Sequence, residues 1–164
     1  MDSEINIKII LKTLILFPLF MIFIMFPLCV FIVLTAFIPK GRVLATKLYE
    51  FFGWIGIVLV GIKLEVIGLE KINTEKSYVV IGNHPSTLDI FTHITALPIS
   101  IRFLTKTELF RIPIFGRVLK TLGLPRIDRK NAKANFEKIN ESINEVIKLG
   151  NSIMIFPEGK RSNQ

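Results

Sequence analysis

Residues 78–89 read Tyr-Val-Val-Ile-Gly-Asn-His-Pro-Ser-Thr-Leu-Asp, and this stretch decides the fold. The run YVVIG at 78–82 is rich in β-branched residues and ends in glycine, which predicts a buried strand. Pro85 fits the first turn of a helix, where its missing backbone N–H costs nothing, and a helix is predicted over 86–96. His84 therefore falls at a corner between strand and helix, where its imidazole can reach a reacting group.

Short β-rich runs and helical runs alternate around this corner. Such alternation is typical of an α/β domain, and we predict a mainly parallel sheet with flanking helices. Besides YVVIG, the predicted strands are LEVIG at 64–68, IRFL at 101–104, LPRI at 124–127 and SIMIF at 152–156, and the further predicted helices cover 113–121 and 130–149. The last helix is expected to cover the sheet, because apolar residues recur in it at three- and four-residue spacing: Phe136, Ile139, Ile143, Val146 and Ile147.

The N-terminal part of the chain is strongly apolar. No charged residue occurs from Leu14 to Ile38, a stretch longer than the roughly 20 residues that cross a bilayer as a helix. We predict a retained membrane-anchoring helix, either a kinked span or a segment that dips into one leaflet, because Pro18 and Pro27 fall inside it. Residues 43–62 form a second apolar stretch, expected at the membrane interface or, alternatively, packed on the domain. The predicted division is membrane and interfacial helices in 1–62 and an α/β domain in 63–164.

Net charge and cysteine content limit the kinds of partner and metal site that the sequence allows. The net charge is +8, and residues 99–164 hold 13 Lys and Arg against 6 Asp and Glu, a local net charge of +7. A basic face beside a membrane anchor attracts anionic lipid headgroups, so we predict membrane lipids as partners and no nucleic acid. Cys29 is the only cysteine, which excludes a disulfide framework and a thiolate metal site, and no metal is predicted.

The corner at His84 also indicates a type of reaction. Ligands of parallel α/β sheets gather at the carboxyl ends of the strands, where His84 lies. Asp89 follows five residues later, so a bent corner is needed to bring its carboxylate to the imidazole. A carboxylate on one ring nitrogen prepares the other nitrogen to take a proton from a substrate hydroxyl, and no protein nucleophile is then required. His93, four residues after Asp89, is the rival base.

Three segments carry a family resemblance. Asn83-His84-x4-Asp89, then Gly123-Leu-Pro-Arg126-Ile-Asp128-Arg129, then Phe156-Pro157-Glu158-Gly159-Lys160-Arg161-Ser162 resemble, in order and spacing, the first three motifs of the lysophosphatidic acid acyltransferase family. The resemblance covers roughly residues 60–164. It implies a membrane-bound enzyme that moves a fatty acyl group from acyl-CoA or acyl carrier protein to the free hydroxyl of a lysophospholipid, with no bound cofactor. It further implies the inner or cytoplasmic membrane, with the catalytic domain on the cytoplasmic side.

The resemblance also assigns roles to residues. His84 would be the general base and Asp89 its partner, while Arg129 and Arg161 would bind the phosphate of the acceptor. Arginine suits that task because its planar fork of donors matches phosphate oxygens. In the third motif, Glu158 is expected to accept a hydrogen bond from a glycerol hydroxyl. Gly159 beside it would let the backbone approach the ligand closely.

Two residues depart from the family pattern, and both add positive charge. Arg126 stands where an aromatic or aliphatic residue is usual, and Lys160 stands where threonine is usual. Arg126 is expected either to contact a phosphate or to point to the surface from its short strand. Lys106, between the first two motifs, is a predicted contact of the acyl donor or of a phosphate.

A fourth, proline-containing motif of the family is not found in these 164 residues. SIMIF is therefore expected near a sheet edge with unpaired backbone groups. Two functions stay open at this point: an active acyltransferase that uses His84 and Asp89, and a truncated, catalytically silent lipid-binding relative.

Overall fold

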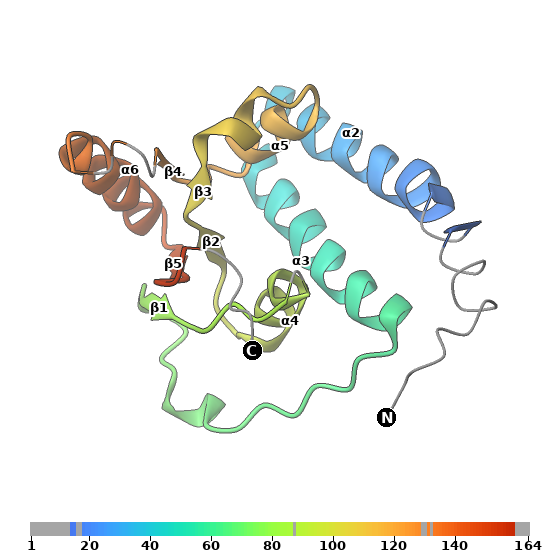
Figure 1. The fold of residues 1–164 in the computed structure, drawn as a ribbon, viewed down its shortest axis with the longest axis horizontal. Helices are drawn as coiled ribbons and strands as arrows, with labels where there is room; N and C mark the ends of the chain where they lie inside the picture. The colour runs from blue at the N-terminus through green and yellow to red at the C-terminus, as the bar shows by residue number, and fades with distance from the viewer. Residues whose placement is uncertain (1–13, 16–17, 87, 129–130, 132, 160–164) are drawn as a thin grey trace, which may run out of the picture.

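Every strand pair in the described part of the chain is parallel, and Figure 1 shows the strands among the helices. The computed structural model describes residues 14–15, 18–86, 88–128, 131 and 133–159. Its main sheet has the order β1-β5-β2, in which β1 is Val79–Ile81, β2 is Ile101–Phe103 and β5 is Ser152–Ile155. A second parallel pair joins β3, Thr105–Lys106, to β4, Arg126–Ile127. The predicted α/β class is confirmed.

The predicted edge position of SIMIF is wrong. β5 is the central strand, with Met154 opposite Val80 on one side and opposite Phe103 on the other. The crossover from β1 to β2 leaves a space between these strands, and the last strand fills it. Both backbone edges of β5 are therefore paired, and Ile153 and Met154 are almost fully buried.

The helices of the domain begin later than the sequence predicts. They are α4, Asp89–Ala96, α5, Phe115–Thr121, and α6, Phe136–Lys148, with a 3-10 turn η4 at Thr107–Arg111. α6 packs against β5, as predicted, and buries Val146. Phe136 is 62% exposed, contrary to its predicted place on the covered face, because it is the first residue of α6.

LEVIG at 64–68 is not a strand, so this prediction is wrong. The segment is irregular and exposed, and Ile67 is 88% accessible. Gly68 turns the backbone with φ of 88°, and the 3-10 turn η3, Leu69–Lys71, follows. A β-rich composition forms a strand only beside a partner strand, and within the described residues this segment has none.

The first apolar stretch is helical from Pro18 to Phe37. It contains a π-helical segment η1, Met21–Met25, then α2, Phe26–Leu34, and a 3-10 turn η2, Thr35–Phe37. Pro27 cannot donate a backbone hydrogen bond to the preceding turn, and the π-helical segment lies where that bond would form. The predicted disturbance at the prolines thus takes the form of a widened turn in a continuous helix.

The second apolar stretch is α3, Gly41–Val60. Both stretches are 20 residues long and apolar enough to cross a membrane by length and composition, and only 18% and 28% of their most apolar windows are buried. α3 packs along α4, which favours the alternative of a helix packed on the domain (Figure 1). Its other face is exposed and includes Trp54 and Phe51.

Glycine allows the close approach of α3 and α4. A Cβ at Gly56 would collide with the ring of Phe91, and a Cβ at Gly53 would collide with Ile94. The close packing of α4 on α3 at Gly53 and Gly56 positions α4, and hence the corner that precedes it.

We expect Gly56→Ala to destabilise the protein by about 1–3 kcal/mol, because the ring of Phe91 must move out of a packed interface. Alanine is the better helix former by about 1 kcal/mol, which offsets only part of this cost. Thermal unfolding in neutral detergent would measure the change, with the exposed Val58→Ala as the control. A melting temperature equal to or above that of the wild type would contradict this description of the interface.

Candidate active site

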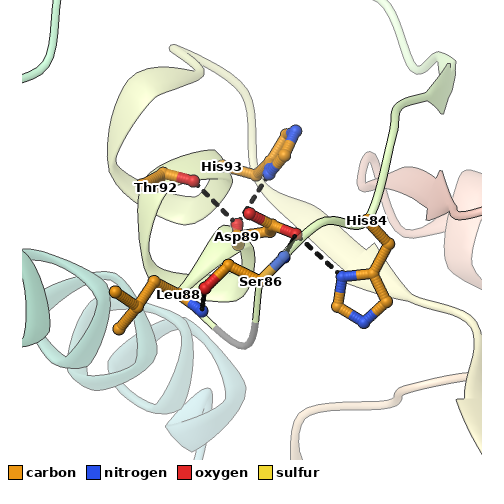
Figure 2. Close-up of polar contacts among 6 residues, drawn as sticks. All are labelled: His84, Ser86, Leu88, Asp89, Thr92 and His93. Carbon is orange, nitrogen blue, oxygen red and sulfur yellow. Dashed lines mark hydrogen bonds and ion pairs between the residues drawn. The ribbon is translucent and has the colours of Figure 1, made fainter. Parts of the chain in front are cut away.

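The imidazole of His84 and the carboxylate of Asp89 are in contact (Figure 2). His84 Nδ1 lies 2.9 Å from Asp89 Oδ2, and the two side chains are 20% and 13% exposed. A carboxylate can only accept, so Nδ1 carries the proton and donates it to Asp89. Nε2 of a neutral His84 is then an acceptor. The contact predicted from the sequence is confirmed, while the catalytic roles of both residues stay predictions.

The corner between β1 and α4 holds His84, Pro85 and Ser86 ahead of the helix. The helix begins at Asp89, so Pro85 lies ahead of it and not in its first turn as predicted. Asp89 Oδ2 also accepts the backbone N–H of Ser86 at 2.9 Å, and Ser86 Oγ accepts the N–H of Leu88 at 3.1 Å (Figure 2). The carboxylate at the first position of α4 is further favoured by the helix dipole. Asp89 is thus held from two directions.

The rival base, His93, makes a different contact. Its Nδ1 donates to the backbone carbonyl of Asp89 at 2.6 Å, not to the carboxylate (Figure 2). Its Nε2 faces Gly82, where a Cβ would lie 3.2 Å away. The carboxylate therefore orients His84, and His93 braces the first turn of α4.

Phe156 supports the imidazole of His84. It follows β5 directly, and its ring stacks on His84 with centroids 4.3 Å apart and planes 10° apart. Phe103 stacks on Phe156 at 5.7 Å, and His93 approaches the same ring edge-on at 5.7 Å. Sequence reasoning did not assign this role to Phe156. Its place at the end of the predicted strand SIMIF, at the edge where His84 lies, was the available signal.

An apolar cavity of about 210 Å³ lies beside this stack. Phe103 and the residues that follow Asp89, Ile90 and Phe91, line one part of it. Leu28 of α2 and Val118 of α5 line another part. The sequence did not predict the cavity, because its walls come from elements far apart along the chain.

Some of the predicted substrate-binding residues lie in the described part of the chain, and others lie outside it. Glu158 is exposed in the turn after β5, and Gly159 has φ of 66° and donates its N–H to the carbonyl of Phe156 at 3.0 Å. Lys106 is exposed on β3. Arg126 is also exposed, with its guanidinium 4.2 Å from the ring centroid of Phe110. The other two predicted contacts, Arg129 and Arg161, lie outside the described residues, as does Lys160, which departs from the family pattern.

Arg126 lies away from His84 and Asp89. It lines a groove with basic residues of α3, α5 and α6, and neither His84 nor Asp89 lines that groove. The structure thus separates Arg126 from the histidine–carboxylate pair. Among the described residues, no group of three His, Cys, Asp or Glu could hold a metal ion.

A parallel α/β sheet with a carboxylate-oriented histidine at its carboxyl edge, next to an apolar cavity, is an arrangement that can take a proton from a hydroxyl group beside an apolar ligand. The model of the acyltransferase family matches residues 63–164. The chain belongs to the acyltransferase family.

Two relatives have the word acyltransferase in their names. A 1-acyl-sn-glycerol-3-phosphate acyltransferase of Cocos nucifera is 34% identical over 125 residues, which are 76% of this chain and 40% of that protein. The enzyme of that name from Pseudomonas aeruginosa is 33% identical over 125 residues, 76% of this chain and 48% of that protein. This chain thus spans less than half of the length of either relative.

A solved structure has the same fold. The crystal structure of the 1-acyl-sn-glycerophosphate acyltransferase PlsC from Thermotoga maritima has a TM-score of 0.68 and 24% sequence identity. The match covers 96% of this chain and 62% of that one. The likeness extends over the N-terminal helices as well as the sheet.

Proposed function

We propose that this protein transfers a fatty acyl group from an acyl thioester to the free hydroxyl of lysophosphatidic acid, in phospholipid biosynthesis. The observation that carries the proposal is the 2.9 Å contact between His84 Nδ1 and Asp89 Oδ2. The acceptor is taken from the names of the relatives, which are 1-acyl-sn-glycerol-3-phosphate acyltransferases.

The chemistry needs no protein nucleophile. Nε2 of His84 takes the proton of the acceptor hydroxyl as its oxygen attacks the thioester carbonyl. The tetrahedral intermediate collapses with cleavage of the C–S bond, and the imidazolium returns the proton to the departing thiolate. Asp89 keeps the tautomer and stabilises the imidazolium while it exists. Stacking on Phe156 holds the ring in the orientation that this transfer requires.

The apolar cavity supports an acyl donor. It is bounded by Phe103 on the side of the His84 stack, so an acyl chain inside it would leave its carbonyl near the imidazole. The thioester carrier, acyl-CoA or acyl carrier protein, would stay outside the cavity. No bound cofactor enters this reaction, and the carrier is a second substrate. Arg129 and Arg161 remain the predicted ligands of the acceptor phosphate.

Exposed apolar side chains on α2, η2 and α3 support membrane association. They include Phe31 at 60%, Phe37 at 82% and Trp54 at 51% exposure. We place these faces in the inner or cytoplasmic membrane, which is where the lysophospholipid resides. The domain would lie on the cytoplasmic side, because acyl-CoA and acyl carrier protein occur there.

Acyl transfer by the purified chain in mixed micelles tests the proposal. Palmitoyl-CoA or a palmitoylated carrier protein would be the donor, and lysophosphatidic acid and lysophosphatidylcholine the paired acceptors. We expect phosphatidic acid together with one equivalent of free thiol, and much slower transfer to the choline lipid. A folded, micelle-bound chain that transfers nothing to either acceptor would instead support the silent lipid-binding relative.

A further inference from the structure

A basic groove of about 500 Å³ lies between α6 and the elements that face it. It is lined by the start of α3, the end of α5, β4 and one side of α6. Four exposed cations, one from each of these elements, face it together with two acids: Arg42, Lys120, Arg126 and Lys138, with Asp128 and Glu145. Its volume is in the range of small-ligand sites.

Among the described residues, no carboxylate forms an ion pair with a cation of the groove. Arg126 is held in place by the ring of Phe110, 4.2 Å from its guanidinium carbon, so its N–H groups are available to a ligand. A concave surface with excess positive charge and a fixed arginine fork matches a phosphate group.

The groove is separate from the candidate active site. His84, Asp89 and Phe156 do not line it. The apolar cavity and the groove share a single lining residue, Leu124. A ligand in the groove would therefore lie behind the wall of the cavity and away from the reacting groups.

Apolar surface adjoins the groove at the connection between α2 and α3. Arg42 is the second residue of α3, and its neighbour Val43 is 62% exposed. Phe37 and Ile38, just before the connection, are 82% and 51% exposed. Where these side chains enter a bilayer, the groove lies at the level of the headgroups, so its occupant should combine a phosphate with an apolar part.

We propose that the basic groove binds the phosphate headgroup of an anionic phospholipid, whose acyl chains lie along the exposed apolar surface at Phe37 and Val43. The bound lipid is a resident of the membrane and not a reactant. The site would fix the rotation of the domain on the bilayer. The inference does not depend on the proposed function, because binding can be measured without any acyl transfer.

Binding of a short-chain fluorescent phosphatidylglycerol to the full chain in neutral detergent micelles, followed by anisotropy, tests the proposal. Phosphatidylglycerol is used because it is neither the acceptor nor the product of the proposed reaction. The double variant Arg126→Gln with Lys138→Gln is expected to bind about tenfold or more weakly, because each basic residue at a lipid surface contributes measurably. Phosphatidylcholine of the same chain length should not compete for the site.

The matched control is the pair Arg117→Gln with Lys148→Gln. It removes the same two residue types from α5 and α6, and both side chains are exposed and do not line the groove. We expect its affinity to stay within about threefold of the wild type. Equal losses of affinity in both double variants would mean that the probe is attracted by diffuse charge. Displacement of the probe by inorganic phosphate or free coenzyme A at equal concentration would mean that the groove binds a soluble ligand. Either result would overturn the proposal. It would also be overturned if the variant Arg126→Gln with Lys138→Gln kept the melting temperature of the wild type and bound the probe with wild-type affinity.

Discussion

His84→Ala is expected to reduce kcat for acyl transfer by about a hundredfold or more, with a smaller change in KM. The imidazole is the group that takes the proton of the acceptor hydroxyl in the proposed reaction, and Asp89 Oδ2 at 2.9 Å orients it. Removal of the ring leaves the apolar cavity intact, so binding of the acyl chain should persist. Initial rates of thiol release at saturating donor, over a series of lysophosphatidic acid concentrations, would separate the two parameters.

His93→Ala is the matched control for this variant. Both substitutions remove an imidazole that contacts Asp89, but His93 contacts only the backbone carbonyl. We expect His93→Ala to lose stability through the first turn of α4 and to keep at least a tenth of wild-type kcat. The opposite order, with His93→Ala inactive and His84→Ala active, would transfer the role of base to His93.

Local pattern was enough to predict the corner. The β-branched run before His84 gives a strand, and the spacing to Asp89 requires a bend if the two side chains are to meet. The structure shows that bend and the contact. The pattern did not reveal the second hydrogen bond to Asp89 Oδ2, from the N–H of Ser86, because this bond depends on Ser86 lying ahead of the helix.

Long-range pairing could not be read from the sequence. SIMIF has the composition of a buried strand wherever it lies, and its central place depends on the gap between β1 and β2. LEVIG has a similar composition and forms no strand, because no partner strand lies beside it in the described residues. Composition predicts the tendency of a segment to pair, whereas the order of strands is a property of the whole sheet.

Arg102 is the clearest residue that sequence reasoning missed. It lies in the predicted strand IRFL and is 1% exposed, although arginine is rarely fully buried. Its Nε donates to the carbonyl of Leu122 at 2.8 Å, and its two terminal nitrogens reach Ser100 Oγ at 2.8 Å and Thr46 Oγ1 at 2.7 Å. Burial lowers the pKa of the guanidinium, and the partners that compensate come from α3 and from the end of α5. No local pattern could have identified them.

Arg102→Ala is therefore expected to destabilise the protein by about 3–5 kcal/mol, the cost of a buried cavity lined by polar groups that have lost their partner. Removing a charge from the interior recovers some solvation energy, but the guanidinium is already solvated by the two carbonyls and two hydroxyls that bind it, so the loss of these bonds dominates. At this chain length, the apparent melting temperature in detergent should fall by about 10 °C. Arg117→Ala, at an exposed position of α5, should change it by less than about 2 °C. Arg102→Lys should fall between the two, because an ammonium keeps the charge but cannot reach all the partners of the planar fork. A stable Arg102→Ala would mean that the packing of α3 on α4 and of α2 on α5 is enough to hold the N-terminal helices on the domain without this side chain.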